Sequence, residues 1–523
     1  MRLCLASLIV ASSAFAAPAT QYNEPLAPSP RPALEARIEA LVAEVAGHER
    51  REVPRPDARL ARAAEDLVRH TAPDGRPPNE QVQAALWLNG IIEPPPHLIL
   101  ANTSPGPDGE QAVLTELRAQ LPRALSQGRY RRVGAATQRY GEQVLVLVAL
   151  QESGIELSPL PRSLPNGGPT SLVGEVRAPF QRPEAFVTGP DGQVTRLALE
   201  GDATHFRGTF RCGPARGRYQ LELAAEDRFG ASVLANFPIY CGVPAPSALP
   251  PVTTAVRAED KLADGPSAEA AMVRLVNQDR AHTGLPALEV DARLTQIARG
   301  HSADMQAHGF VGHVSPTTGS AADRFRRAGV DAVLIAENVA RAYSPGEAEL
   351  GLMESPGHRA NILNRDVTRV GVGAIITDGI GGARELLVTQ VFCKPPERID
   401  AGSAVTLRHE IEALRHAHHL GALGADPALD LVAQSTAEGI ARGSLRAERA
   451  GEPIERALGK LADRYQSMRS VVATSSGVAQ VVSGVEKSLL DQTVTTVGVG
   501  VAAGRRPDGS PAVFAVLVLA TRR

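Results

Sequence analysis

Apolar positions follow two different spacings along the middle and end of this chain. One set stands at i, i+3, i+4, i+7 and i+11: Leu294, Ile297, Ala298, His301 and Met305. That spacing predicts a helix with all five residues on one face. The segments 386–393 (LLVTQVFC) and 512–520 (AVFAVLVLA) are mostly or wholly apolar runs, which are typical of buried strands. The second run is also too short to cross a membrane, which takes ~20 residues.

The same patterns return farther along the chain. Residues 285–294 (LPALEVDARL) resemble 420–429 (LGALGADPAL), and 367–373 (VTRVGVG) resemble 494–500 (VTTVGVG). The matching residues of the first pair and its continuation are Leu285, Ala287, Leu288, Asp291, Leu294 and Ala298, which recur as Leu420, Ala422, Leu423, Asp426, Leu429 and Ala433. Each glycine-containing repeat precedes one of the two apolar strands. We therefore predict that 268–396 and 400–523 are two copies of one fold.

A fainter copy and a different kind of domain precede these two. Residues 57–60 (DARL) repeat 291–294, and 131–150 resemble the closing hairpin of the other copies, so we expect a degenerate copy at 32–155. Residues 168–244 hold short alternating strands separated by turn signals, which predicts a small antiparallel β-sandwich. The proline-rich residues 245–266 are expected to be a linker.

The first twenty residues have one positive charge, an apolar run and a small-x-small site before Ala17. This predicts a secretory signal at 1–16, and hence an extracellular or periplasmic protein with no transmembrane segment after its removal. Charge is balanced, with 55 basic and 57 acidic residues, so nothing indicates nucleic acid as a partner. In an oxidising compartment we expect a disulfide between Cys212 and Cys241, which leaves Cys393 as an inert thiol in a buried strand.

Four polar residues of the second copy fall on loop edges or helix ends, where functional groups are commonly placed: His313, Glu337, Glu354 and His358. Ser355 and Pro356 suit the N-cap and first position of a helix, which puts His358 in its first turn, where the helix dipole favours a neutral ring. Two other sets of histidines are better explained by structure. His301 is expected to be a packing residue, and His416, His418 and His419 a solvated helix end.

The motifs GFVGHVSP, AENVA and SPGHRANIL, in this order after NQDRAHTGLPALEVDARL, resemble the bacterial branch of the CAP superfamily (cysteine-rich secretory, antigen 5 and pathogenesis-related-1 proteins). The resemblance covers 268–396. It implies an α/β fold, an α-β-α sandwich with a cleft that holds two His and two Glu. His313, Glu337 and His358 match three of these positions, and either Glu354 or Ser355 takes the fourth. Together with the repeats, it predicts three α-β-α units and one β-sandwich.

The outer copies lack the matching residues. Val485 stands where the third copy would have His358, and residues 100–103 (LANT) of the first copy contain no glutamate. We therefore expect both outer copies to have kept the core and lost the site.

Two imidazoles with carboxylates can hold Zn²⁺ or another divalent cation, or act as an acid and a base. Ser315 and Ser355 both precede proline and suit turns, and the chain has no HExxH or G-x-S-x-G motif. The sequence therefore favours a secreted, non-enzymatic protein that binds a small molecule, a lipid or a peptide. A metal-assisted hydrolase using the same cleft and an adhesive or envelope-associated structural protein are the two alternatives. The ligand and the oligomeric state are open at this point.

Overall fold

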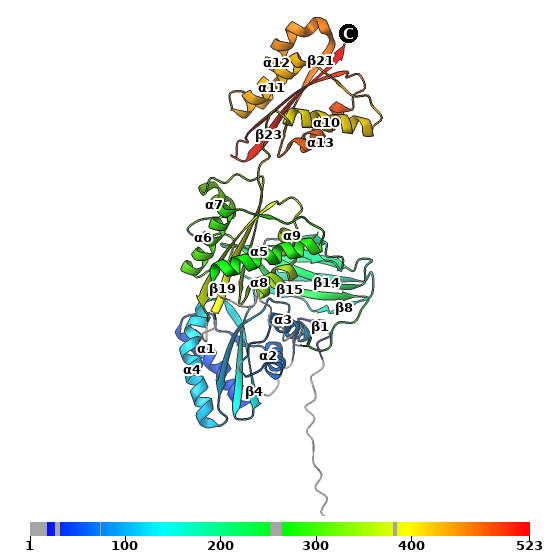
Figure 1. Cartoon of the computed structure of the whole chain (residues 1–523). Helices are drawn as coiled ribbons and strands as arrows, with labels where there is room; N and C mark the ends of the chain where they lie inside the picture. Colours follow the sequence, from blue (N-terminus) through cyan, green and yellow to red (C-terminus); the bar gives the residue numbers. More distant parts are fainter. Residues whose placement is uncertain (1–17, 27–31, 74, 252–263, 380–383) are drawn as a thin grey trace, which may run out of the picture.

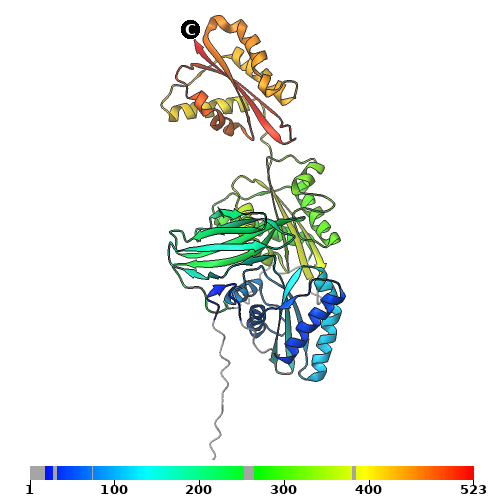
Figure 2. The ribbon, with the colours of Figure 1, turned by 180° about the vertical axis from the view of Figure 1, so that it is seen from behind.

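The computed structural model describes residues 18–26, 32–73, 75–251, 264–379 and 384–523. Figures 1 and 2 show three bodies packed together and a fourth, ending at the C-terminus, that stands apart from them. The expected signal at 1–16 lies outside the described residues, as does most of the expected linker at 245–266. Within those described ranges, no helix has the length and hydropathy needed to cross a membrane.

Three four-stranded sheets have the same strand order, and in each the short first strand pairs in parallel and the others antiparallel. In chain order the sheets are β2 (Arg55–Pro56), β4 (Tyr130–Tyr140), β5 (Gln143–Glu152), β3 (His97–Thr103); β16 (Glu289–Val290), β18 (Arg369–Asp378), β19 (Arg384–Lys394), β17 (Leu334–Ala342); and β20 (Gly424–Ala425), β22 (Thr496–Arg505), β23 (Pro511–Arg522), β21 (Tyr465–Ser475). Both apolar runs are buried central strands, β19 and β23, as their sequence predicts.

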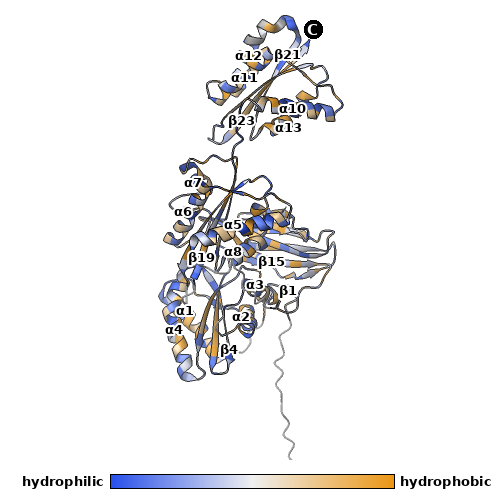
Figure 3. Cartoon of the chain, in the orientation of Figure 1, coloured by the Kyte–Doolittle hydropathy of each residue, from blue (hydrophilic) through white to orange (hydrophobic). Residues whose placement is uncertain are grey.

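Helices cover both faces of each sheet. On the first sheet, α1 (Ala33–His48) and α4 (Pro107–Ser126) lie on one face, and α2 (Ala58–His70) and α3 (Asn79–Leu88) on the other. On the second sheet, α5 (Gly265–His282), α8 (Pro345–Glu354) and α9 (Pro356–Ile362) lie on one face, and α6 (Ala292–His308) and α7 (Ala321–Arg327) on the other. On the third sheet, α10 (Ser403–Ala417) and α13 (Val478–Leu489) lie on one face, and α11 (Pro427–Ala441) and α12 (Gly451–Leu458) on the other. Figure 3 shows hydrophobic residues along the central strands and mixed colouring on the covering helices. The predicted α/β class with layered helices is confirmed.

The β-sandwich lies between the first and second of these units in the chain. Its sheets have the orders β11 (Val194–Leu197), β10 (Gln181–Thr188), β14 (Gly217–Asp227), β15 (Gly230–Cys241), β8 (Ser163–Leu164); and β12 (Leu199–Gly201), β13 (His205–Arg211), β9 (Pro169–Val176), β6 (Ile155–Leu157). It therefore begins before the expected boundary at 168, because β6 continues the edge of one sheet. The short strand β1 (Gln21–Tyr22) pairs with β7 (Leu160–Pro161) beside it.

The predicted disulfide is present. Cys212 and Cys241 are bonded, with their Cα atoms 5.7 Å apart, and Cys393 is a buried free thiol. Burial raises the pKa of Cys393 to about 11, which keeps it protonated and inert.

A glycine in each four-stranded sheet allows one helix to approach closely. A Cβ atom on Gly371 of β18 would collide with the backbone carbon of Leu294 in α6. The same relation joins Gly498 to Leu429 and Gly134 to Leu60. The three helices also begin alike, because the carboxylates of Asp57, Asp291 and Asp426 accept hydrogen bonds from backbone N–H groups of their first turns. These are the residues that the sequence repeats preserve.

Side-chain contacts also join the second unit to the first and last units. Arg76 of the first unit lies 3.4 Å from the centre of the Tyr343 ring, and Arg505 of the last unit forms an exposed ion pair of 2.7 Å with Asp331. The segment 395–402 joins β19 to α10.

We expect Gly371→Ala to destabilise the protein by about 1–3 kcal/mol, because the new methyl group must displace the α6 backbone. Gly300→Ala, on the exposed side of α6 with no atom within 4 Å of the new Cβ, is the control and should stabilise it by about 0.5–1 kcal/mol. Thermal and urea unfolding measure both changes. A Gly371→Ala protein as stable as the parent would contradict the close approach.

Candidate functional site

Three of the four predicted site residues come together in the second unit. His313 lies in the loop after α6, Glu337 is in β17, and His358 is in the first turn of α9. The His313 Nδ1 and Glu337 Oε1 atoms are 3.1 Å apart. His313 is also close enough to His358 to affect its pKa. We call these three residues the His/Glu cluster.

The carboxylate of Glu337 is buried and fully engaged. Its Oε1 atom accepts from His313, and its Oε2 atom lies 2.5 Å from Nη2 of Arg324 in α7. Burial alone would raise the pKa of Glu337, but the His313 hydrogen bond and the Arg324 charge outweigh burial and hold this pKa below its usual range. Glu337 is therefore an anion that fixes the His313 ring by its Nδ1 atom.

His358 is held by a different chain of hydrogen bonds. Its Nδ1 atom lies 2.8 Å from Ser355 Oγ, and the Ser355 hydroxyl donates to Oε2 of Glu222 in β14. The other Glu222 oxygen accepts from the Gly357 backbone N–H at 3.0 Å. Burial, with a smaller effect of His313, lowers the pKa of His358 to about 3, so the ring is neutral. When Glu222 is ionised, this chain puts the proton of His358 on Nδ1 and leaves a lone pair on Nε2.

The sequence left the fourth position open between Glu354 and Ser355, and in the structure Ser355, not Glu354, contacts His358. Glu354 ends α8 and forms an ion pair with Arg218 of β14. The next residue, Ser355, is the one that faces His358. Ser355 follows the end of α8 in an extended backbone conformation, with φ −92° and ψ 116°, so its side chain leaves in a different direction from that of Glu354. The second carboxylate near the cluster is Glu222, which the β-sandwich supplies.

The β-sandwich also covers the other side of the cluster. The Phe229 carbonyl, at the turn between β14 and β15, accepts from the backbone N–H groups of His313 and Val314 at 2.7 and 2.8 Å. The Phe229 ring stacks on Phe310 with centroids 5.1 Å apart. Both histidines are thus positioned by contacts with a second domain.

Sequence reasoning missed a buried amide network behind the cluster. Asn338 Nδ2 donates to the His358 carbonyl at 3.2 Å and to Gln390 Oε1 at 2.9 Å. Gln390 in turn donates to Glu349 of α8 at 2.7 Å, and Asn361 donates to Asn338 at 2.9 Å. The network ties β17, β19, α8 and α9 together and fixes α9 against the strand that bears Glu337. The signal was available for Gln390, a polar residue inside the largely apolar strand β19.

His301 and the histidines at the end of α10 lie outside the His/Glu cluster. His301 is fully buried, with Nε2 2.8 Å from the Gly312 carbonyl oxygen and 3.9 Å from Glu337. In the predicted helix-end tract, His418 lies 3.7 Å from Glu486 and is about half exposed.

The residues present do not fit a resident metal ion. In the described parts of the chain, no group of three or more His, Cys, Asp or Glu side chains is placed to hold one. Sites that hold zinc supply three or four protein ligands. Here both oxygens of Glu337 are taken by His313 and Arg324, which leaves two imidazole nitrogens.

A four-stranded sheet between helical layers, with two histidines and a glutamate gathered from a loop, a strand and a helix, defines this unit as a domain of the CAP class. Residues 273–392 match the family model for CAP, the cysteine-rich secretory protein family. This segment, about a quarter of the chain, is a CAP domain.

Two proteins of Bacillus subtilis (strain 168) are similar to it. The "Uncharacterized protein YkwD" is 37% identical over 113 residues, which are 21% of this chain and 44% of that protein. The "Uncharacterized membrane protein YlbC" is 39% identical over 108 residues, 20% of this chain and 31% of that protein. The chain thus spans less than half the length of each of these relatives.

Among solved structures, an extracellular protein with an SCP domain from Bacillus anthracis is 21% identical with a TM-score of 0.22, covering 46% of this chain and 67% of that one. A cysteine-rich secretory protein from Staphylococcus aureus is 12% identical with a TM-score of 0.20, covering 47% and 81%.

We expect Glu222→Gln to disturb the tautomer of His358, because a neutral amide no longer favours one direction of the Ser355 hydrogen bonds. The ¹⁵N resonances of the His358 ring should move from one tautomer toward a mixture, while those of His301 stay in place. Glu226→Gln, farther along the same strand and paired with exposed Arg182, is the control. Unchanged His358 resonances in Glu222→Gln would show that the relay does not set the tautomer.

Glu349 makes stability depend on pH. Burial, reinforced by nearby Asp279, raises the pKa of Glu349 to about 8. In the unfolded chain this carboxyl releases its proton at about pH 4.3, whereas in the folded protein it keeps the proton up to about pH 8. Its contribution to stability is therefore fully present below about pH 4.3 and is lost as the pH rises to about 8. We expect Glu349→Gln to flatten the fall of Tm between pH 5 and 8.5, whereas Glu142→Gln, at a 92% exposed side chain, leaves it unchanged. Parallel curves for parent and Glu349→Gln would contradict this assignment.

Proposed function

We propose that this chain is an exported, non-enzymatic binding protein whose CAP domain holds a small molecule, peptide or lipid through the Nε2 atoms of His313 and His358. One observation carries the proposal. In both rings Nδ1 is hydrogen-bonded, to Glu337 or to Ser355, and Nε2 has no partner among the described residues. Such nitrogens suit a ligand that offers hydroxyl or amide donors.

The environment of the nearby nucleophiles favours binding over hydrolysis. Ser315 and Ser355 are each 4% exposed, and their hydroxyls donate to the carboxylates of Asp304 and Glu222. In a serine hydrolase the hydroxyl donates to the histidine instead. The metal-assisted alternative is weakened by the ligand set, because Glu337 is already neutralised by Arg324.

We further propose that the three α/β units are copies of one domain and that the outer two have lost the site. The strand registers pair Gly371 with Glu337 through Val391, Gly498 with Ser470 through Val518, and Gly134 with Leu98 through Ala149. A buried arginine supports the kinship of the last two units. Arg280 donates to the carbonyls of Pro286, Ile362 and Asn364, and Arg415 donates to those of Gly421, Leu489 and Asp491. The outer units have hydrophobic cores and lack the His/Glu cluster, which suits a structural role on a cell envelope or surface.

Zinc chloride is a suitable probe of the two free nitrogens, since Zn²⁺ binds neutral imidazole. The three histidines at the end of α10 would compete for zinc. The parent protein for this test is therefore the full chain with His416, His418 and His419 replaced by glutamine. We expect this parent to bind zinc weakly at one site in a calorimetric titration. In the double variant His313→Ala with His358→Ala, affinity should fall at least tenfold, about 1.4 kcal/mol.

His308→Ala serves as the matched control, because His308 lies on the same helix–loop segment but pairs with Asp304. It should bind like the parent. Equal binding by the double variant, or no binding by the parent, would overturn the proposal and leave the His/Glu cluster as a structural network.

A further inference from the structure

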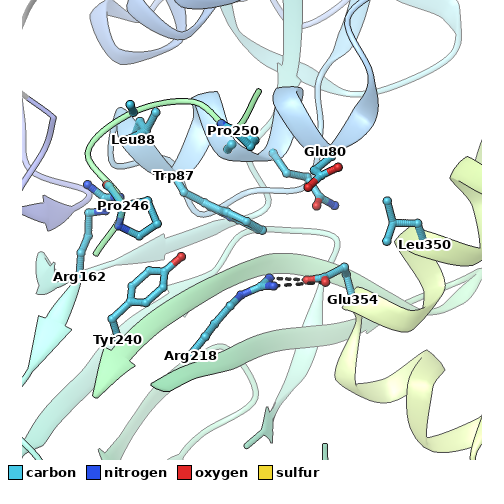
Figure 4. A pocket seen from close by; sticks show the side chains of 13 residues that line it. Glu80, Trp87, Leu88, Arg162, Arg218, Tyr240, Pro246, Pro250, Leu350 and Glu354 are labelled. Atoms are coloured by element: carbon cyan, nitrogen blue, oxygen red, sulfur yellow. Dashed lines mark hydrogen bonds and ion pairs between the residues drawn. The ribbon is translucent and has the colours of Figure 1, made fainter. Parts of the chain in front are cut away.

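A second candidate site lies where three domains meet. A cavity of about 280 Å³ opens between α3 of the first unit, β14 and β15 of the sandwich, and α8 of the CAP domain. Figure 4 shows side chains from all three directed into it. Its lining includes Glu354, which does not contact the His/Glu cluster. The His/Glu cluster contributes no residue to its lining.

Two aromatic rings lie in its wall. Trp87 and Tyr240 line the cavity together with Pro246 and Pro250. The indole of Trp87 is held by a hydrogen bond of 3.1 Å from Nε1 to the Asn236 carbonyl, so its edge is anchored. The Arg218 guanidinium lies 5.1 Å from the centre of that ring. Ring faces of this kind pack favourably on an aromatic ligand.

One charge in the wall has no carboxylate partner among the described residues. Arg162 is 4% exposed, and its Nη1 and Nη2 atoms donate only to the carbonyls of Ala19 and Pro246, at 2.8 and 3.0 Å. A buried cation without an anion is costly. Arg280, by contrast, has three carbonyl acceptors and does not line this cavity.

Two further groups complete a polar side of the cavity. The Tyr240 hydroxyl points into the space between Trp87 and Arg218 and has no hydrogen-bond partner within the described chain (Figure 4). Arg218 is paired with Glu354, at the side where α8 enters. An incoming anion would compete with Glu354 for Arg218 and would accept a hydrogen bond from the Tyr240 hydroxyl.

We propose that this cavity binds a small aromatic carboxylate, with its ring against Trp87 and its carboxylate near Tyr240, Arg162 and Arg218. The volume equals that of roughly nine water molecules, which suits a ligand of about ten to twelve non-hydrogen atoms. The lining holds two arginines, Arg162 and Arg218, and two glutamates, Glu80 and Glu354, of which only Glu354 is paired with an arginine of the cavity. Such a ligand would supply a carboxylate for Arg162 and fill the apolar part of the cavity.

The chain offers a direct readout, because Trp87 is its single tryptophan. The experiment titrates the full-length protein with 3-phenylpropanoate and follows Trp87 fluorescence. The control ligand is 3-phenylpropanamide, which has the same shape without the charge. We expect a saturable change with the carboxylate and at least tenfold weaker binding of the amide. Hexanoate, with the charge but no ring, should also bind more weakly.

Two substitutions test the roles of the polar groups. Tyr240→Phe keeps the ring and should weaken 3-phenylpropanoate binding about tenfold, as expected for losing a hydrogen bond to a charged group. Glu354→Gln removes the competitor for Arg218 and should strengthen binding several-fold. Because this second variant predicts a gain, a loss of folding cannot imitate it.

Equal affinity for the acid and its amide, or no saturable signal from either, would refute the proposal. A loss of binding in Glu354→Gln would refute the competition for Arg218. The variant His313→Ala with His358→Ala should leave the Trp87 signal unchanged, which separates this cavity from the function proposed for the His/Glu cluster.

Discussion

A buried carboxylate that crosses a domain boundary determines the arrangement around the His/Glu cluster. Glu222 belongs to the β-sandwich, yet both of its oxygens are bonded to the start of α9, through Ser355 and the Gly357 N–H. Burial raises the pKa of Glu222 to about 7, against the effect of these bonds. A carboxyl at 2% exposure is tolerated in a sheet only while such partners are in place. This one contact therefore links the position of the sandwich to the orientation of His358.

The two histidines illustrate two ways of holding an imidazole. His313 is fixed by a carboxylate of its own domain, which Arg324 keeps ionised. His358 is fixed by a hydroxyl whose carboxylate comes from elsewhere in the chain. Both rings are anchored by Nδ1, so the two Nε2 atoms are the ones left to bind a ligand. Binding that involves either atom is thermodynamically coupled to the contact between the domains, and this coupling acts in both directions.

The sequence was most informative where local rules and global packing agree. Asp291 and Asp426 begin helices, and Gly371 and Gly498 admit them against a sheet, because these demands are local and recur in every copy. Motif order likewise located His313, Glu337 and His358. Glu222 could not be found by such rules, since its partner is more than a hundred residues away in sequence. The choice between Glu354 and Ser355 stayed open for a related reason: at a helix end, one residue decides whether a side chain lines the cavity between the domains or contacts His358.

The last unit is attached to the others in a different manner. The eight residues 395–402 connect it to β19, and its ion pair with Asp331 is exposed, a type of contact that contributes little and weakens with salt. Eight residues reach at most about 28 Å. Anything held by this unit is thereby kept near the CAP domain at an effective concentration in the millimolar range, even where free affinity is low. Through a tether of this length, the last unit, which lacks the histidines, can affect the ligand occupancy of the CAP domain.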